Sequence, residues 1–177
     1  MAMKLWSPFT IVFLVLIFQE SLLFSAMADR KFIESVCRST PSTNLCLKTV
    51  LADPKSKDAD LTGLALIIVY AVKDKGNKII HQIKTLEKHG RPELRPVLKY
   101  CERVYNTAVT VDVKLAVDAL TLGNVKFGEN GMADVVVESR SCEDTFDQYA
   151  LKSPMTEINK GMEDIANVAR AIIRMLL

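Results

Sequence analysis

The sequence contains few of the side chains on which enzyme active sites most often depend. Its 177 residues include two histidines, His81 and His89, and four cysteines. We find no GxSxG motif, no phosphate-binding glycine loop, no serine close to both a histidine and an acid, and no CxxC pair. The histidines lie among lysines and are interpreted as surface residues. The sequence therefore predicts a protein that is not an enzyme and that holds neither a cofactor nor a metal.

An excess of charge of one sign is also missing. The chain has 23 basic and 21 acidic side chains, for a formal net charge of +2. It therefore lacks the large positive charge that is typical of proteins that bind nucleic acid. The acidic pairs at residues 143–144 and 163–164 would diverge by about 100° on a helix, so we interpret them as solvated faces. With 49% hydrophobic and 25% charged residues, the composition is typical of one globular domain.

The hydrophobic run at the N-terminus has the three parts of a secretory signal peptide. Lys4 precedes the apolar residues 11–18, and the small-residue pattern Ala-Met-Ala follows at residues 26–28. A signal anchor is the alternative, but the polar residues 19–20 interrupt the run and leave its apolar part too short to span a bilayer. We predict a cleaved signal peptide at residues 1–28, a secreted domain at 29–177, and no membrane segment after cleavage.

The four cysteines would then lie in an oxidising compartment, where an even number predicts disulfides. Cys37 and Cys46 flank a turn signal at Pro41, so pairing them would close a short helical hairpin. This would leave Cys101 to pair with Cys142. On spacing alone the other pairings stay open.

Helical periodicity runs through the remaining sequence. One helix is predicted from an N-cap at Asp60 to Gly90, and a second from Pro92 to Gly123 with a kink at the β-branched residues 109–113. The third and fourth helices are predicted near residues 135–149 and 155–176. The residues expected to face inward are Leu61, Ala65, Ile68, Val72, Ile79, Ile83 and Leu86, then Leu94, Leu98, Cys101, Tyr105, Ala108, Val111, Leu115 and Leu120, then Val135, Ser139, Cys142, Phe146 and Tyr149, and finally Met155, Ile158, Met162, Ile165, Ala169, Ile172 and Leu176.

Four amphipathic helices joined by short loops must bury their apolar faces against one another. We therefore predict an all-α fold, an antiparallel four-helix bundle at residues 58–177. It is preceded by a disulfide-clipped N-terminal helical hairpin at residues 29–57. The hairpin is too small to be a domain of its own.

Residues 122–132 do not fit the helical periodicity. Three glycines and two asparagines predict a loop, with Lys126 and Phe127 side by side at its centre. Two interpretations are open: the loop presents both side chains outward, or Phe127 packs back onto the bundle while Lys126 is merely solvated. Loops of this length in small bundles often carry function.

Several short segments, taken in order, resemble one known family. They are the spacing from Cys37 through Pro41 to Cys46, residues 52–56 with 59–60, residues 64–67, the pair Cys101 and Cys142, and the ending at residues 167–177. The sequence is similar over essentially all of 29–177 to the plant invertase and pectin methylesterase inhibitors, and most of all to inhibitors of cell-wall and vacuolar β-fructosidase. The resemblance implies a four-helix bundle with a helical hairpin, the pairings Cys37–Cys46 and Cys101–Cys142, and a location in the apoplast (cell wall) or vacuole.

The resemblance also implies a target and a mechanism. Invertase inhibitors of this family carry a Pro-Lys-Phe motif in the loop before the third bundle helix, and that loop enters the target's active site. Valine replaces the proline here, so the lysine and phenylalanine carry over and the rigidity of proline does not. The implied partner is acid invertase, and the implied target-binding residues are Asn124, Val125, Lys126, Phe127, Gly128 and Glu129.

Within that set, Lys126 would lie among the target's acidic side chains and Phe127 would fill apolar space at the mouth of the pocket. Asn124, Gly128 and Glu129 would shape the loop or contact the rim. Two alternatives stay open. One is a pectin methylesterase inhibitor that binds through the bundle face, and the other is a secreted helical binding or signalling module.

Overall fold

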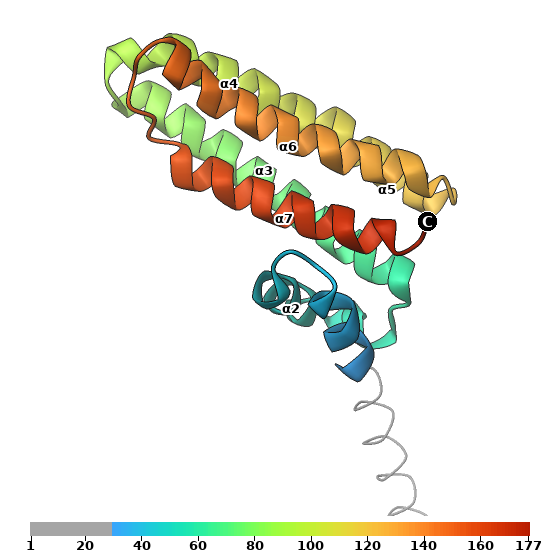
Figure 1. The fold of residues 1–177 in the computed structure, drawn as a ribbon. Coiled ribbons are helices and arrows are strands. Elements are labelled where there is room, and N and C mark those ends of the chain that lie inside the picture. Colours follow the sequence, from blue (N-terminus) through green and yellow to red (C-terminus); the bar gives the residue numbers. More distant parts are fainter. Residues whose placement is uncertain (1–29) are drawn as a thin grey trace, which may run out of the picture.

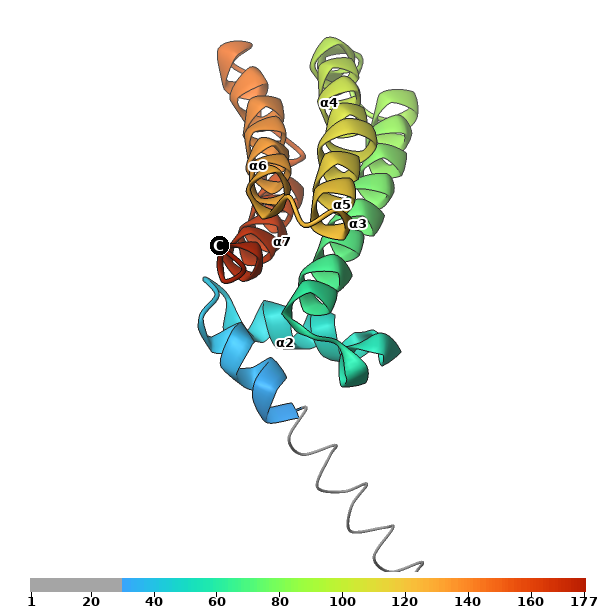
Figure 2. The same cartoon turned by 90° about the vertical axis from the view of Figure 1, so that its right-hand side faces the viewer.

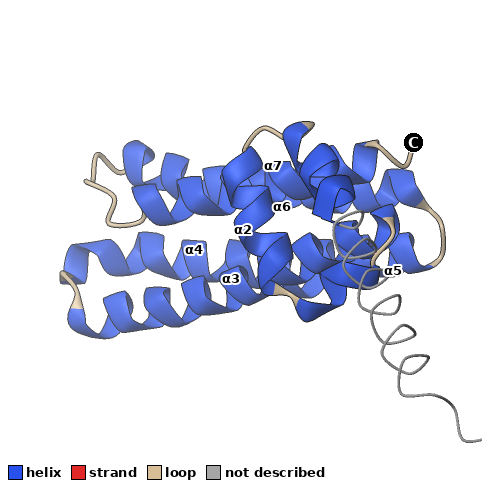
Figure 3. Cartoon of the chain, turned by 90° about the horizontal axis from the view of Figure 1, so that it is seen from below, coloured by secondary structure: helices blue, strands red, loops and turns tan. Residues whose placement is uncertain are grey.

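The computed structural model describes residues 30–177, and the regular structure of these residues is helical (Figures 1 and 3). The signal peptide predicted for residues 1–28 lies outside the described residues. Within residues 30–177, none of the helices combines the length and the apolar character that crossing a membrane requires.

A helical hairpin precedes the bundle, as predicted. Residues 30–38 are helical and are followed by α2 (Thr43–Ala52). The buried Cys37 and Cys46 form a disulfide with their Cα atoms 5.4 Å apart. A 3-10 turn, η1 (Pro54–Asp58), then leads into the bundle. Figure 2 shows this hairpin lying across the end of the bundle at which α3 begins.

The four bundle helices run side by side in Figure 1, which confirms the predicted fold. The Asp60 carboxylate caps the first of them by accepting from the backbone N–H of Gly63 at 2.8 Å, and Gly90 ends it, both as predicted. Pro92 opens a short 3-10 turn that leads into the second helix. The elements of the bundle are α3 (Leu61–His89), η2 (Pro92–Leu94), α4 (Arg95–Thr107), α6 (Val125–Gln148) and α7 (Thr156–Arg174).

A π-helical turn, η3 (Ala108–Asp112), lies where the kink was predicted and joins α4 to α5 (Val113–Thr121). A π turn holds more residues than an α turn, so it changes which positions face the core after it. The prediction that Val111 and Leu115 face inward is therefore wrong, because both are exposed. Asp112 and Val113 are buried instead.

The buried Asp112 carboxyl leads to a prediction about stability. Burial, together with the nearby acids Asp134 and Glu138, raises its pKa from 3.8 to about 6. Ionising it at neutral pH therefore opposes folding, and the folded state gains stability as the pH falls from above 6 towards 4. We expect Asp112→Asn to raise the free energy of unfolding at pH 7 by about 2 kcal/mol. Urea unfolding should show that the difference from the wild type disappears below about pH 4, and a constant difference across this range would contradict the assignment.

The core contains most of the side chains predicted to face inward. Cys101 and Cys142 are fully buried and form a disulfide between α4 and α6, with their Cα atoms 4.8 Å apart. Met155 and Met162 are also core residues, while His81 and His89 are exposed as predicted. Tyr149 is an exception, because α6 ends at Gln148 and leaves the Tyr149 ring exposed.

A polar network crosses the bundle near the α6–α7 connection. The Tyr105 hydroxyl donates to Oδ1 of Asn159 at 2.7 Å, and the Asn159 amide donates to the Glu143 carboxylate at 2.7 Å. Glu143 also accepts from the hydroxyls of Ser153 and Thr156. The interpretation of Glu143 as part of a solvated acidic face is therefore wrong, since it holds the α6–α7 connection in place.

We expect Tyr105→Phe to lower the free energy of unfolding by about 1–2 kcal/mol, because it leaves the buried Oδ1 of Asn159 without a donor. Burial raises the pKa of the Tyr105 hydroxyl, so the donor is present throughout the neutral range. Urea unfolding measures the loss. Tyr70→Phe, at an exposed position on α3, is the matched control, and an equal effect in both variants would contradict the role given to the network.

Candidate functional site

The segment predicted as a loop is mostly helical. Only residues 122–124 connect α5 to α6, and α6 begins at Val125, so the prediction of irregular structure for residues 125–132 is wrong. Gly123 makes the sharp turn at a φ of 77°, a conformation that favours glycine. The N–H of Asn124 then donates back to the carbonyl of Ala119 at 2.7 Å.

The other two glycines of this segment serve helix packing. A Cβ atom on Gly131 would lie 2.5 Å from the carbonyl oxygen of Asp112, and one on Gly128 would lie 3.2 Å from Cγ of Leu120. Both glycines are buried inside α6. They let α6 approach α5 and the π turn closely, so the glycine content that predicted a loop marks a tight helix contact.

The structure brings the six predicted target-binding residues to the N-terminal end of α6 and divides them by exposure. Lys126 and Phe127 lie in the first turn, with 65% of the Lys126 side chain and 58% of Phe127 exposed. The interpretation in which Phe127 packs back onto the bundle is therefore wrong. Val125 packs against the core, and the exposed Asn124 accepts the N–H of Phe127 on its carbonyl at 3.0 Å. Gly128 and Glu129 are buried.

Glu129 lies beneath the exposed pair and gathers three cations. Its side chain is 4% exposed, and its carboxylate accepts from Lys126 at 2.5 Å, from Arg174 at 2.8 Å and from Arg170 at 3.1 Å. The hydrogen bond from Lys126 and those from the two arginines outweigh burial and lower the pKa of Glu129 to about 2. Glu129 is thus an ionised interior group that shapes the site, and in this structure it is not placed to contact a target's rim.

We call this group, made of Lys126, Phe127, Glu129, Arg170 and Arg174, the cationic tip. One carboxylate faces three cations, so the tip carries excess positive charge. It lies at the N-terminus of a 24-residue helix, where the helix dipole also favours an approaching anion. The tip can therefore bind a carboxylate and present an exposed aromatic ring beside it.

The two arginines of the tip are not among the site residues predicted from the sequence. Arg170 and Arg174 are four residues apart on α7 and share one face of that helix. The spacing alone could have marked them as two cations on one helix face. It could not have shown that both pair with Glu129 on α6, because that contact exists only in the folded bundle. Within residues 30–177, no three His, Cys, Asp or Glu side chains converge as metal ligands would.

Comparison with known proteins identifies the class to which this bundle belongs. The family model described as plant invertase/pectin methylesterase inhibitor matches residues 31–172. The cell wall / vacuolar inhibitor of fructosidase 1 of Arabidopsis thaliana is 39% identical over 146 residues, which cover 82% of this chain and 69% of that protein. The pectinesterase inhibitor of Actinidia deliciosa is 24% identical over 156 residues, covering 86% and 83%.

A solved structure shares the fold. The mutant form A of a pectin methylesterase inhibitor from Arabidopsis superposes with a TM-score of 0.67 at 17% identity, covering 82% of this chain and 97% of that one. These matches place the chain among proteinaceous enzyme inhibitors, in agreement with the sequence-based prediction. It belongs to the plant invertase/pectin methylesterase inhibitor family.

Proposed function

We propose that the protein is a secreted inhibitor of acid invertase (β-fructofuranosidase) and that it blocks the active site with Lys126 and Phe127. The supporting observation is the exposure of these two side chains together at the start of α6. A relative named an inhibitor of fructosidase supports the choice of target. Glycosidases hydrolyse their substrate with a pair of acidic side chains. An ammonium group placed among those acids would balance their charge while the first turn of α6 excludes the sugar.

The two arginines of the cationic tip would keep the buried Glu129 carboxylate paired when Lys126 moves away from it. In the free protein the Lys126 ammonium lies on Oε2 of Glu129, while Arg170 and Arg174 both lie on Oε1. When Lys126 turns towards a target, the two arginines still pair with Glu129. This lowers the cost of redirecting Lys126, because an unpaired buried carboxylate would oppose the movement.

Phe127 would contribute apolar contact with the target, and Val125 would hold the first turn of α6 in place. Burying an exposed phenylalanine in a pocket mouth is worth about 1.5–3 kcal/mol before the costs of docking. Val125 occupies the first position of α6 and packs against the core. Packing of this side chain into the bundle would fix the first turn where the family motif uses the ring of a proline.

The proposed route to the target is secretion to the cell wall or vacuole after removal of residues 1–28. A relative named for both locations supports it. N-terminal sequencing of the protein recovered from the secretory route of plant cells should begin at Asp29. A chain that retains residues 1–28 would contradict cleavage.

Pectin methylesterase is the second candidate target, and the fold shared with a pectin methylesterase inhibitor favours it. In that case the face of the bundle would bind the enzyme, and the cationic tip would not be required. Loss of the Lys126 side chain would then leave inhibition intact.

The two candidates are separated by assaying the oxidised chain of residues 29–177 against purified acid invertase and purified pectin methylesterase. Inhibition of invertase alone is the expected result. Inhibition of pectin methylesterase alone would transfer the assignment to the second candidate. Inhibition of neither enzyme by protein with both disulfides formed would overturn both.

A further inference from the structure

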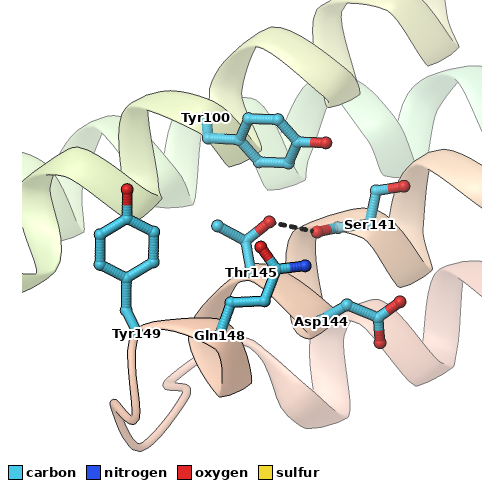
Figure 4. A pocket seen from close by; sticks show the side chains of 6 residues that line it. All are labelled: Tyr100, Ser141, Asp144, Thr145, Gln148 and Tyr149. Carbon is cyan, nitrogen blue, oxygen red and sulfur yellow. Dashed lines mark hydrogen bonds between the residues drawn. The ribbon is translucent and has the colours of Figure 1, made fainter.

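A polar hollow of about 300 Å³ lies between α4 and the C-terminal half of α6 (Figure 4). Its volume is at the lower end of the range of about 300–1,000 Å³ found for small-molecule sites. Four of its side chains share one face of α6, one comes from α4, and one follows the end of α6. The lining residues are Tyr100, Ser141, Asp144, Thr145, Gln148 and Tyr149.

The walls of the hollow are held at a fixed separation. Tyr100 and Ser141 immediately precede Cys101 and Cys142, and the disulfide between these cysteines holds their Cα atoms 4.8 Å apart. The Thr145 hydroxyl donates to the carbonyl of Ser141 at 2.7 Å. The N–H of Tyr149 donates to the carbonyl of Thr145 at 3.2 Å, which fixes the backbone beyond the end of α6. A ligand would therefore meet a preformed backbone framework, which reduces the entropic cost of binding to that of ordering the side chains.

The side chains of the hollow have free capacity for hydrogen bonding. Of the six lining residues, Thr145 alone uses its side chain in a hydrogen bond or ion pair to another of the residues 30–177. Two phenol rings, a carboxylate, a carboxamide and a hydroxyl thus border one hollow, with the Asp144 carboxylate at its edge. In Figure 4 the Thr145 and Gln148 side chains lie below the Tyr100 ring and beside the Tyr149 ring.

This combination of groups fits the chemistry of a sugar ring. A hexopyranose has an apolar C–H face that stacks on an aromatic ring, and its adjacent hydroxyls pair well with the planar groups of Asp and Gln. The Asp144 carboxylate is the one charged group among the lining residues, and it would repel an acidic sugar and accept from the hydroxyls of a neutral one. The Arg103 guanidinium lies over the Tyr100 ring, 5.5 Å from its centroid, so a sugar would stack on the opposite face of that ring. An apolar ligand would leave these polar groups unpaired.

We propose that this hollow binds a neutral hexopyranose unit of an oligosaccharide or polysaccharide. Tyr100 and Tyr149 stack on the ring, and Asp144 and Gln148 bind its adjacent hydroxyls. The distance along α6 from Lys126 to Tyr149 is roughly 34 Å at 1.5 Å per residue. Binding here leaves the cationic tip free, so the inference does not rest on the identity of the inhibited enzyme.

The test is a titration of ¹⁵N-labelled, oxidised residues 29–177, followed by two-dimensional NMR. The probes are three neutral tetrasaccharides, namely cellotetraose, mannotetraose and galactotetraose, and one acidic probe, tetragalacturonate. We expect at least one neutral probe to shift the amide signals of residues 141–149 saturably. The acidic probe should bind at least tenfold more weakly than that neutral probe.

Variants connect the signal to the hollow. Tyr149→Ala and Asp144→Ala, both at exposed positions, should each weaken binding at least tenfold. Tyr70→Ala removes an exposed tyrosine from α3 and serves as the matched control, and Lys126→Ala tests independence from the tip. Both should bind like the wild type. The proposal is overturned if no neutral probe shifts these signals, if tetragalacturonate binds more tightly, or if Tyr149→Ala binds as well as Tyr70→Ala.

Discussion

Lys126→Ala should weaken inhibition of acid invertase by about 30- to 5,000-fold, which corresponds to about 2–5 kcal/mol. The size of the effect follows from the proposed contact. In the complex the Lys126 ammonium would lie among target carboxylates away from water, so truncating it would leave those charges unpaired. In the free protein Arg170 and Arg174 would still pair with Glu129 after the Lys126 side chain is removed, so the substitution should leave the fold intact. Inhibition constants measured at one pH for both proteins give the ratio.

Lys114→Ala is the matched control for this prediction. Lys114 is also an exposed lysine, and it pairs with the carboxylate of Asp118 on its own helix, α5. It differs in lying outside the cationic tip. We expect Lys114→Ala to change inhibition by less than about threefold, as for an ordinary surface charge. Equal losses in the two variants would point to a general effect of net charge, and no loss in Lys126→Ala would remove the tip from the mechanism.

Glu129→Ala should lower the free energy of unfolding at pH 7 by about 2–4 kcal/mol. The variant removes the single carboxylate that three cations share, and removing one partner of a buried ion pair is strongly destabilising. Lys126 and Arg174 can turn to water because their side chains are exposed, whereas Arg170 is partly buried and loses more. Urea unfolding followed by circular dichroism measures the difference.

The pH dependence of this destabilisation distinguishes the loss of the Glu129 charge from the loss of its packing. The cations lower the pKa of Glu129 from 4.5 to about 2, so its stabilising charge is fully present above pH 4.5 and disappears as the pH falls towards 2. The gap between wild type and Glu129→Gln, which keeps the size of the side chain, should therefore narrow over that range. Glu157→Ala removes an exposed glutamate from α7 and is the matched control. It should lower the free energy of unfolding by less than about 1 kcal/mol. A gap of constant size from pH 7 to pH 3 would contradict the ion-pair explanation.

Apolar spacing and end signals were sufficient to predict the fold. The Asp60 cap and the Gly90 stop depend on local chemistry that can be read from neighbouring residues, and both are present as predicted. The inward stripe of α7 follows from its regular spacing of three and four. Where structure is determined by local chemistry and helical period, the sequence alone predicts it.

The errors came from contacts between distant segments. The β-branched run indicated where the second helix departs from regularity, but not that a π turn at residues 108–112 would change the register of α5. Gly131 is glycine because the carbonyl of Asp112 lies against it, a contact that exists only once α5 and α6 are packed. In the same way, Lys126 could be singled out from the sequence, while its link through Glu129 to Arg174 required the folded bundle.

The Cys101–Cys142 disulfide also determines what a protease could release. The bridge closes a covalent ring that spans 41 positions and contains the second half of α4, all of α5, the connection at residues 122–124 and most of α6. Lys126 and Phe127 lie within that ring. A single cut at the exposed connection beside them would leave both new ends attached through sulfur. A chain cut once in this connection would therefore stay in one piece, and its two fragments could re-form the same helix contacts without diffusing apart.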